Sequence, residues 1–230
     1  NPSQYMYDQP LMMYARDVHT CWDKYSLYYD VPALVFDLTN DNYLLDPDDV
    51  AKYLPMRLLD LRTASNEGDP IAERFWAVIY DTCRFEGVTG NTLNQYLADK
   101  YVNDLVCCVG TVLGTTFTGQ GDPIAEIDSV VTTVNANSRT GFEVPIHVDA
   151  ASGGFVVPFT DPTQAWDYSL DNVMSINVSN HKFGSTYPGC GTITFRNEDV
   201  VPQELIWKIT YLGGAFTDYT VNFSRDSAGP

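Results

Sequence analysis

Two residues that can do chemistry lie where apolar runs of the chain end. Asp149 ends one apolar run, and Lys182 follows a later one, 33 residues further along. A lysine is a nucleophile toward an aldehyde when its neutral amine is accessible, which partial burial and nearby cations promote. A carboxylate can keep a pyridine nitrogen protonated, which makes such a ring an electron sink. Because 33 residues suit one crossover between adjacent strands, we expect one crevice to receive both side chains.

Each of these residues, taken alone, also fits a structural role. Lys182 fits a solvated lysine beside a turn, Asp149 a helix N-cap before a small-residue turn, and His147 a histidine of the core. The small residues 150–154 (AASGG) favour the first interpretation, because they leave room for a flat ring. A buried, unpaired carboxylate is costly, so we expect Asp149 to have a cationic partner.

The elements that must position these residues alternate between strand and helix. Helical spacing predicts a helix followed by a strand within residues 11–36, the start of a helix at 46–49, and a helix at 124–135. Apolar runs predict strands at 105–113, 144–149, 173–179 and 190–195, the first of them buried on both faces. This alternation is typical of an α/β domain with a mostly parallel sheet flanked by helices. In such sheets the ligand crevice lies beyond the carboxyl ends of the strands, which is where Thr116, Ser179 and His181 also fall.

Residues 58–100 differ in character from the rest of the chain. Residues 63–70 predict a turn-rich linker, and residues 72–83 predict a helix. We expect one domain over residues 1–230, with 58–100 as a surface insertion.

Composition excludes several classes of protein. The chain has 13 Lys and Arg against 30 Asp and Glu, a net charge of −17, which disfavours binding to nucleic acid or to anionic membrane surfaces. No apolar run approaches the ~18 residues of a membrane span, and no signal peptide is visible. Five scattered cysteines predict buried free thiols in a reducing compartment, by default the cytoplasm, and no metal site.

Several motifs together resemble the pyridoxal-phosphate core of glutamate decarboxylases, within the group II amino-acid decarboxylases. They are residues 18–25 (VHTCWDKY), 147–155 (HVDAASGGF), 166–170 (WDYSL), 175–184 (SINVSNHKFG), 187–191 (YPGCG), 202–206 (PQELI), 211–214 (YLGG) and 222–225 (NFSR). The resemblance covers about residues 15–50 and 103–226, with the motifs in the family's order. It implies the large domain of the aspartate-aminotransferase-like (type I) fold of pyridoxal-phosphate enzymes.

The resemblance also implies roles for individual residues. Lys182 would form a Schiff base with pyridoxal 5′-phosphate, Asp149 would pair with the pyridinium nitrogen, and Ala151 would pack on one ring face. His19 takes the catalytic position that stacks on the other face, where glutamate decarboxylases usually carry glutamine and related decarboxylases carry histidine. The other implied cofactor contacts are Thr116, Ser179 and His181 around the phosphate, and Phe223 and Ser224 toward the partner subunit's cofactor.

The implied activity is decarboxylation of a small amino acid, foremost L-glutamate to 4-aminobutanoate and CO2, in a homo-oligomer (dimer or higher) with shared active sites. The chain departs from the family at Asn180, where the family has glycine, so we expect the backbone there to need adjustment. The family's upstream phosphate-binding segment and its C-terminal small domain, with the arginine that holds the substrate, are expected to be absent. Two other functions stay open: decarboxylation of another amino acid, or a truncated homologue that binds without turnover.

Overall fold

The structure is a computed structural model that describes residues 6–7, 9–39, 42–82, 84–85, 89–211 and 214–218. Its centre is a six-stranded sheet in the order β3-β2-β5-β6-β7-β8. The strands are β2 (Leu11–Ala15), β3 (Ala33–Phe36), β5 (Val106–Val112), β6 (Ile146–Asp149), β7 (Val173–Val178) and β8 (Thr192–Phe195). All neighbours run parallel except β8, which is antiparallel to β7. The predicted mostly parallel sheet is confirmed.

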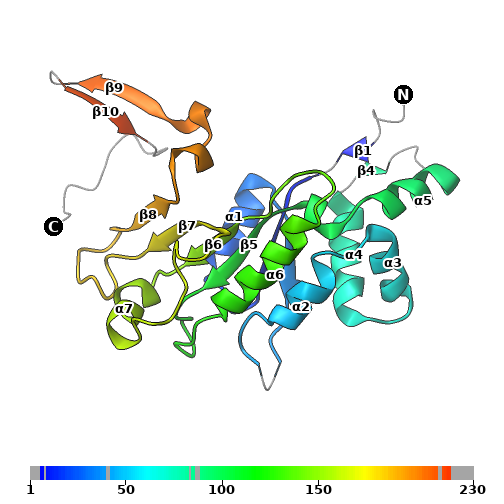
Figure 1. Cartoon of the computed structure of the whole chain (residues 1–230), viewed down its shortest axis with the longest axis horizontal. Coiled ribbons are helices and arrows are strands. Elements are labelled where there is room, and N and C mark those ends of the chain that lie inside the picture. The colour runs from blue at the N-terminus through cyan, green and yellow to red at the C-terminus, as the bar shows by residue number, and fades with distance from the viewer. Residues whose placement is uncertain are drawn as a thin grey trace.

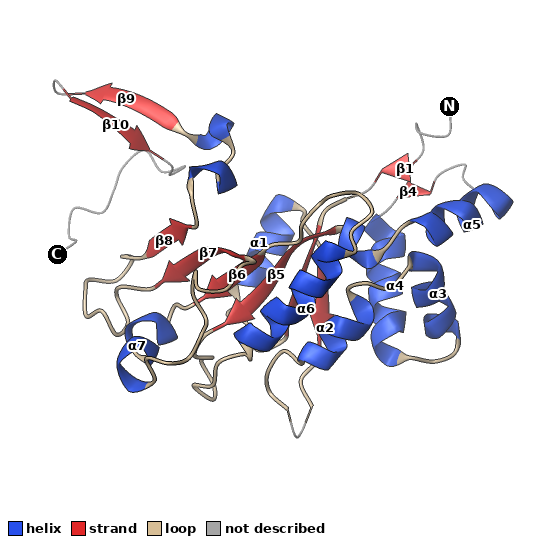
Figure 2. Cartoon of the chain, viewed as in Figure 1, coloured by secondary structure: helices blue, strands red, loops and turns tan. Residues whose placement is uncertain are grey.

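Helices lie on both faces of this sheet. Helices α2 (Pro47–Tyr53) and α6 (Ile124–Ala136) cover one face, and α1 (Cys21–Tyr29) lies on the other (Figures 1 and 2). Helix α6 buries apolar side chains on the side that faces the sheet, whereas α1 has no buried residue. The core therefore lies mainly between the sheet and the α2–α6 layer.

The first strand corrects one prediction. We expected residues 11–36 to begin with a helix, but Leu11–Ala15 form β2, with all five residues buried. The run LMMYA has no polar residue, which suits a central strand covered on both faces. Strand β5 also differs, because Cys107 and Cys108 are only half-buried rather than enclosed on both faces.

Residues 58–100 form a group of helices beside the β3 edge of the sheet (Figure 1). They are α3 (Leu58–Asn66), α4 (Pro70–Thr82) and α5 (Gly90–Asp99). The predicted linker is wrong at 63–66, since α3 continues through Asn66 and only the turn before Pro70 remains. Phe75 of α4 packs edge-on against Phe36 of β3, with ring centroids 5.0 Å apart. The segment thus shares the domain's core, and its status as an insertion remains a prediction.

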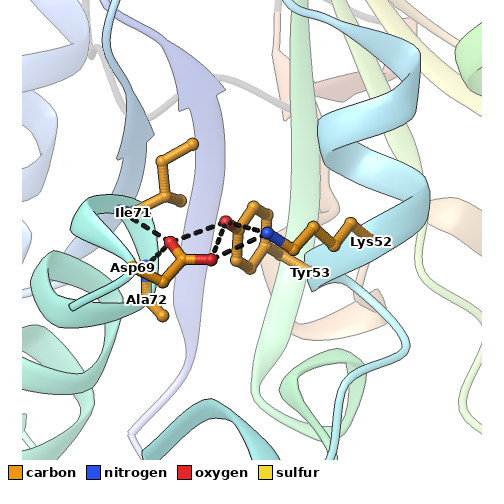
Figure 3. A network of polar contacts seen from close by, with 5 residues as sticks. All are labelled: Lys52, Tyr53, Asp69, Ile71 and Ala72. Carbon is orange, nitrogen blue, oxygen red and sulfur yellow. Dashed lines mark hydrogen bonds and ion pairs between the residues drawn. The ribbon is translucent and has the colours of Figure 1, made fainter. Parts of the chain in front are cut away.

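A polar network fixes the start of α4 against α2 (Figure 3). Asp69 Oδ1 accepts hydrogen bonds from the backbone N–H groups of Ile71 and Ala72, each at 3.0 Å. Its Oδ2 accepts from Lys52 Nζ at 2.7 Å, and the Tyr53 hydroxyl also donates to this carboxylate at 2.8 Å. One carboxylate therefore caps α4 and holds the end of α2.

The remaining described elements are short. They are β1 (Met6–Tyr7) paired with β4 (Arg84–Phe85), α7 (Val157–Thr160), and a hairpin of β9 (Trp207–Tyr211) and β10 (Gly214–Asp218). No helix in the described ranges is both long and apolar enough to span a bilayer. The described cysteines Cys21, Cys107, Cys108 and Cys190 are free thiols, but Cys21 is exposed and the others are half-buried, so the expected full burial is wrong.

Candidate active site

The carboxyl ends of neighbouring parallel strands gather most of the predicted site residues at one edge of the sheet. Asp149 is the last residue of β6, and Ser179 directly follows β7. Thr116 lies on the turn that follows β5, and β5 pairs with β6. This is the edge at which open α/β sheets bind ligands.

Asp149 is buried, 5% exposed, and is held by three donors. Its Oδ1 accepts hydrogen bonds from Asn177 Nδ2 at 3.0 Å and from the Ala151 N–H at 3.1 Å. Its Oδ2 accepts one from Trp22 Nε1 at 3.1 Å. We expected a cationic partner, but the partners found among the described residues are neutral donors. Because each carboxylate oxygen has about two acceptor sites, Oδ2 can accept one further hydrogen bond.

The indole of Trp22 reaches Asp149 because a glycine makes room for it. Trp22 lies on α1, and its ring lies directly over Gly110 of β5, where a Cβ atom would come within 2.3 Å of the indole. The rings of Tyr14 and His147 flank the indole, with centroids 5.1 and 5.7 Å away. Gly110 therefore sets the position of one donor to the carboxylate.

Lys182 reaches the same region from the turn after β7. Its exposed Nζ donates a hydrogen bond to Ser152 Oγ at 3.3 Å, and Ser152 lies just beyond the end of β6. The thiol of Cys21 lies close enough to Asp149 and Lys182 for both charges to affect its pKa. Although the residue as a whole is exposed, partial burial of the thiol raises its pKa, the Asp149 carboxylate raises it further, and the Lys182 ammonium lowers it. Asp149 and Lys182 thus both influence the Cys21 thiol, although only Asp149 lines the cavity described below.

Backbone hydrogen bonds join two further predicted residues to this centre. Ala151 donates its N–H to Asp149 and accepts a hydrogen bond at its carbonyl from the Ser179 N–H at 3.3 Å. The Ser179 carbonyl in turn accepts from the Lys182 N–H at 3.0 Å. The structure therefore links Asp149, Ala151, Ser179 and Lys182 through consecutive contacts.

Three other predicted residues are exposed to solvent. His181 is exposed, and its Nδ1 donates to the Cys190 carbonyl at 2.7 Å. His19 is also exposed, just before α1, where its Nδ1 accepts from the Cys21 N–H at 3.2 Å. Thr116 is exposed on its turn. Phe223 and Ser224 lie outside the described residues.

Asn180 does not require the backbone adjustment that we expected. Its φ is not positive, whereas Ser185 a few residues later has a φ of 58°. The Asn180 side chain donates from Nδ2 to Thr192 Oγ1 at 2.8 Å, which ties the turn to β8. Asparagine is therefore accommodated in ordinary backbone geometry directly before His181 and Lys182.

A cavity of about 710 Å³ opens on the sheet face that α1 partly covers. Its lining residues come from α1, the sheet and the segments before β2 and β3; they are Pro10, Met12, Cys21, Trp22, Tyr25, Val31, Cys107, Cys108, His147, Asp149, Ser175, Asn177 and Ile193. Asp149 contributes a buried carboxylate oxygen with remaining acceptor capacity, and the small Ala150 and Ala151 follow it. This arrangement can bind a flat aromatic ring that carries an N–H donor.

Sequence analysis missed two residues of this site. In the sequence, Trp22 and Asn177 stand out only as members of the motifs at 18–25 and 175–184. Both donate directly to Asp149. A usable signal for Asn177 was the register of adjacent strands, because it lies opposite Asp149 across β6 and β7.

Comparison with known proteins places the chain among decarboxylases. Residues 78–229 match the family described as "Pyridoxal-dependent decarboxylase conserved domain". Glutamate decarboxylase 5 of Arabidopsis thaliana is 34% identical over 221 residues, which cover 96% of this chain and 35% of the relative. The chain thus spans about a third of the length of the curated relatives that it matches.

Solved structures agree with this relationship. The Lactobacillus brevis glutamate decarboxylase superposes with a TM-score of 0.69 at 31% identity, over 96% of this chain and 39% of that one. The sphingosine-1-phosphate lyase of Burkholderia pseudomallei has a TM-score of 0.59 at 16% identity, over 96% of this chain and 38% of that one, and this likeness concerns the fold alone. The fold is the type I fold that these enzymes share, as predicted.

Proposed function

Because the chain belongs to the pyridoxal-dependent decarboxylase family, we propose that it forms the cofactor-binding core of an amino-acid decarboxylase acting on L-glutamate. The observation that carries the proposal is the buried Asp149 carboxylate, held by three donors at the edge of the sheet where Lys182 also lies. The names of the relatives support glutamate as the substrate and 4-aminobutanoate and CO2 as the products.

The residues of the site fit pyridoxal 5′-phosphate. Asp149 Oδ2 would accept the N–H of the ring nitrogen, and Lys182 would attach the cofactor covalently through its amine. Ala151 and His19 would lie against the two ring faces, with Thr116, Ser179 and His181 around the phosphate. When bound, the cofactor supplies a sink for the electrons left on the α-carbon as CO2 departs.

The chain's own contribution is orientation and charge. Asp149 only accepts hydrogen bonds while it is ionised, so it would keep a proton on the ring nitrogen of the bound cofactor. Trp22, Asn177 and Ala151 fix the carboxylate, so that little reorganisation is needed when charge develops. The amine of Lys182 is tethered to Ser152 on the neighbouring strand end.

The decisive experiment is absorption spectroscopy of the purified chain with added pyridoxal 5′-phosphate. We expect a visible band of lysine-bound pyridoxal that Lys182→Ala abolishes. The matched control is Lys24→Ala, which removes an exposed lysine of α1 and should leave the band unchanged. A band that persists in Lys182→Ala would contradict the assignment of the attachment residue.

A second candidate, decarboxylation of another amino acid, is favoured by His19. The resemblance places histidine at this position in related decarboxylases and glutamine in most glutamate decarboxylases. Release of CO2 from a panel of amino acids, with the cofactor added, distinguishes the two. Preference for an aromatic amino acid over glutamate would select the second candidate. A chain that binds cofactor but releases no CO2 from any substrate would be a non-catalytic homologue.

The proposal extends to assembly and location. Phe223 and Ser224 match positions that contact the partner subunit's cofactor, which supports a homo-oligomer with shared sites. The free thiols of the described cysteines support a reducing compartment such as the cytoplasm. Sizing chromatography checks the first point, where a cofactor-binding monomer would count against it.

A further inference from the structure

Four polar side chains form a square on the cavity side of the sheet. His147 and Asp149 are two residues apart on β6, so they point to the same face. Ser175 and Asn177 lie directly opposite them on β7. The His147 ring contacts Ser175 Oγ at 2.7 Å through Nδ1 and Asn177 Oδ1 at 2.8 Å through Nε2, and Asn177 Nδ2 contacts Asp149 at 3.0 Å. All four side chains line the same cavity.

The chemistry of the groups fixes the direction of each hydrogen bond. The Asp149 carboxylate only accepts, so Asn177 must turn its NH2 group toward it. The Asn177 carbonyl then faces His147, and because a carbonyl only accepts, His147 Nε2 must carry the proton. Nδ1 is then left as an acceptor for the Ser175 hydroxyl. The square therefore admits one neutral tautomer of His147 and one orientation of the Asn177 amide.

The surroundings keep His147 in that neutral form. Burial lowers the pKa of His147, although the hydrogen bond to Asn177 and the Asp149 charge act in the opposite sense. Both ring nitrogens are already hydrogen-bonded, so the imidazole is not available to substrate. Its effect on the reaction has to pass through Asn177.

We propose that His147 is a positioning residue that locks Asn177 in the amide orientation needed to hold Asp149. With Asn177 and Ala151 donating to Oδ1, the carboxylate cannot rotate freely, and Oδ2 is the oxygen with acceptor capacity left for a ring N–H. The proposal rests on the proposed function, because it assigns Asp149 to the ring nitrogen of pyridoxal 5′-phosphate.

Nitrogen NMR of the histidines tests the tautomer in the chain without cofactor. At pH 7 we expect His147 to show a protonated Nε2 and an unprotonated Nδ1. In Asn177→Leu the acceptor for Nε2–H is lost, and we expect the two tautomers to become mixed. A wild-type His147 that is protonated on Nδ1 would overturn the proposal whatever the activity.

Cofactor binding tests the connection to Asp149. We expect His147→Leu to bind pyridoxal 5′-phosphate about tenfold more weakly, the effect of one directed hydrogen bond. Binding of the 1-deaza analogue, which has no ring nitrogen, should change little. The control Ser129→Ala removes a hydroxyl that bonds only within α6 and should alter neither affinity. Equal weakening for both compounds would overturn the proposal, since it would reveal general damage to the site.

Asn177→Ala alone keeps the proposal testable if His147→Leu folds poorly, and a double-mutant cycle of the two tests whether His147 acts through Asn177. Asn177→Ala removes the donor to Asp149 directly and should show the same selective loss. If His147 acts through Asn177, the double variant loses no more affinity than Asn177→Ala alone. Additive losses would contradict this dependence. A wild-type chain that binds neither compound would overturn the proposed function, whereas normal wild-type binding with unchanged His147→Leu and Asn177→Ala affinities would overturn the positioning role alone.

Discussion

The hydrogen bond from Trp22 to the buried Asp149 carboxylate depends on Gly110, a residue that does not itself contact the carboxylate. The indole N–H reaches Asp149 because Gly110 lets the ring lie on the backbone of β5. Any side chain at Gly110 would occupy the space of the indole. Trp22, Gly110 and Asp149 therefore act as a unit, although they come from α1, β5 and β6.

Gly110→Ala should displace the indole and remove this hydrogen bond. The new Cβ would lie 2.3–2.4 Å from two ring atoms, which is far inside van der Waals contact. We expect a loss of about 1–3 kcal/mol in the free energy of unfolding, the usual cost of overpacking, measured by urea denaturation. Near-ultraviolet circular dichroism should report the altered environment of the tryptophan.

Gly214→Ala is the matched control for this change. Its Cβ would meet no atom within 4 Å, and its φ is not positive. We expect its stability to remain within about 0.5 kcal/mol of the wild-type value, as for other surface substitutions. If Gly110→Ala were equally harmless, the indole would have an alternative position and the described unit would be wrong.

At the scale of elements, the start of α4 combines a helix cap with an ion pair. Burial alone would raise the pKa of Asp69, but hydrogen bonds from the Ala72 N–H, Lys52 and Tyr53 lower it to about 2. Because the pKa is depressed in the folded state, the stabilisation is present above the unfolded pKa near 3.8 and is lost as the pH falls toward 2.

Asp69→Ala should therefore lower the free energy of unfolding by about 2 kcal/mol at pH 7. The difference from wild type should shrink as the pH falls from 5 to 2, where Asp69 becomes protonated. Asp69→Asn is the matched variant, since its amide oxygen can still cap α4 while the charge is lost. We expect it to retain part of the stability and to lack the acid-dependent change. A pH-independent deficit in Asp69→Ala would show that the ion pair contributes nothing.

At the scale of the whole molecule, the net negative charge and the buried carboxylates both make the folded state less stable as the pH rises. The chain carries a charge of −17, and two buried acids lie close enough to interact, Asp17 at 5% and Asp122 at 1% exposure. Burial raises the pKa of Asp17 to about 6 and that of Asp122 to about 7. Asp122 accepts hydrogen bonds from the Leu45 and Val112 N–H groups, whereas among the described residues neither Asp17 oxygen has a partner.

Asp17→Asn should change how stability depends on pH. A raised folded pKa means that the folded state binds more protons than the unfolded state between pH 4 and 6, so wild-type stability falls as the pH rises through that window. Asp17→Asn removes this titrating group. Its free energy of unfolding relative to wild type should therefore rise by about 3 kcal/mol as the pH increases from 4 to 8, which corresponds to the pKa shift from 3.8 to about 6.

Urea denaturation across that pH range measures the effect. Asp171→Asn is the control, because it removes an equal charge from an exposed position. The buried amide in Asp17→Asn also costs about 1–3 kcal/mol at every pH, so the change with pH is the informative quantity. If the free energies of unfolding of wild type and Asp17→Asn changed in parallel with pH, burial would not raise the pKa of Asp17 in the folded state.

The sequence was informative where one physical signal dominates. The strands ending at Asp149 and Val178 and the helix at Ile124–Ala136 follow from apolar runs and helical spacing, and the parallel sheet follows from their alternation. Periodicity was ambiguous at Leu11–Ala15, where a short apolar run fits a strand or a buried helix.

Cross-strand partners were harder to predict. Lys182 and Asp149 could be placed at strand ends, but the donors Trp22 and Asn177 depend on register and on the space over Gly110. Trp22 and Asn177 can be identified as donors to Asp149 only when the pairing of the strands is known. Among the described residues no cationic side chain pairs with Asp149, because three neutral donors from separate elements hold the carboxylate.

The contact between Trp22 and Asp149 has a kinetic consequence. It joins residues 127 positions apart in the chain, and Asn177 must arrive from a third segment before the carboxylate is complete. Local helices can form early in folding, but contacts of such sequence separation wait for loop closure across the central sheet. We therefore expect a nascent or partly folded chain to lack the assembled Asp149 site, and ligand binding to begin only after β6 and β7 have paired.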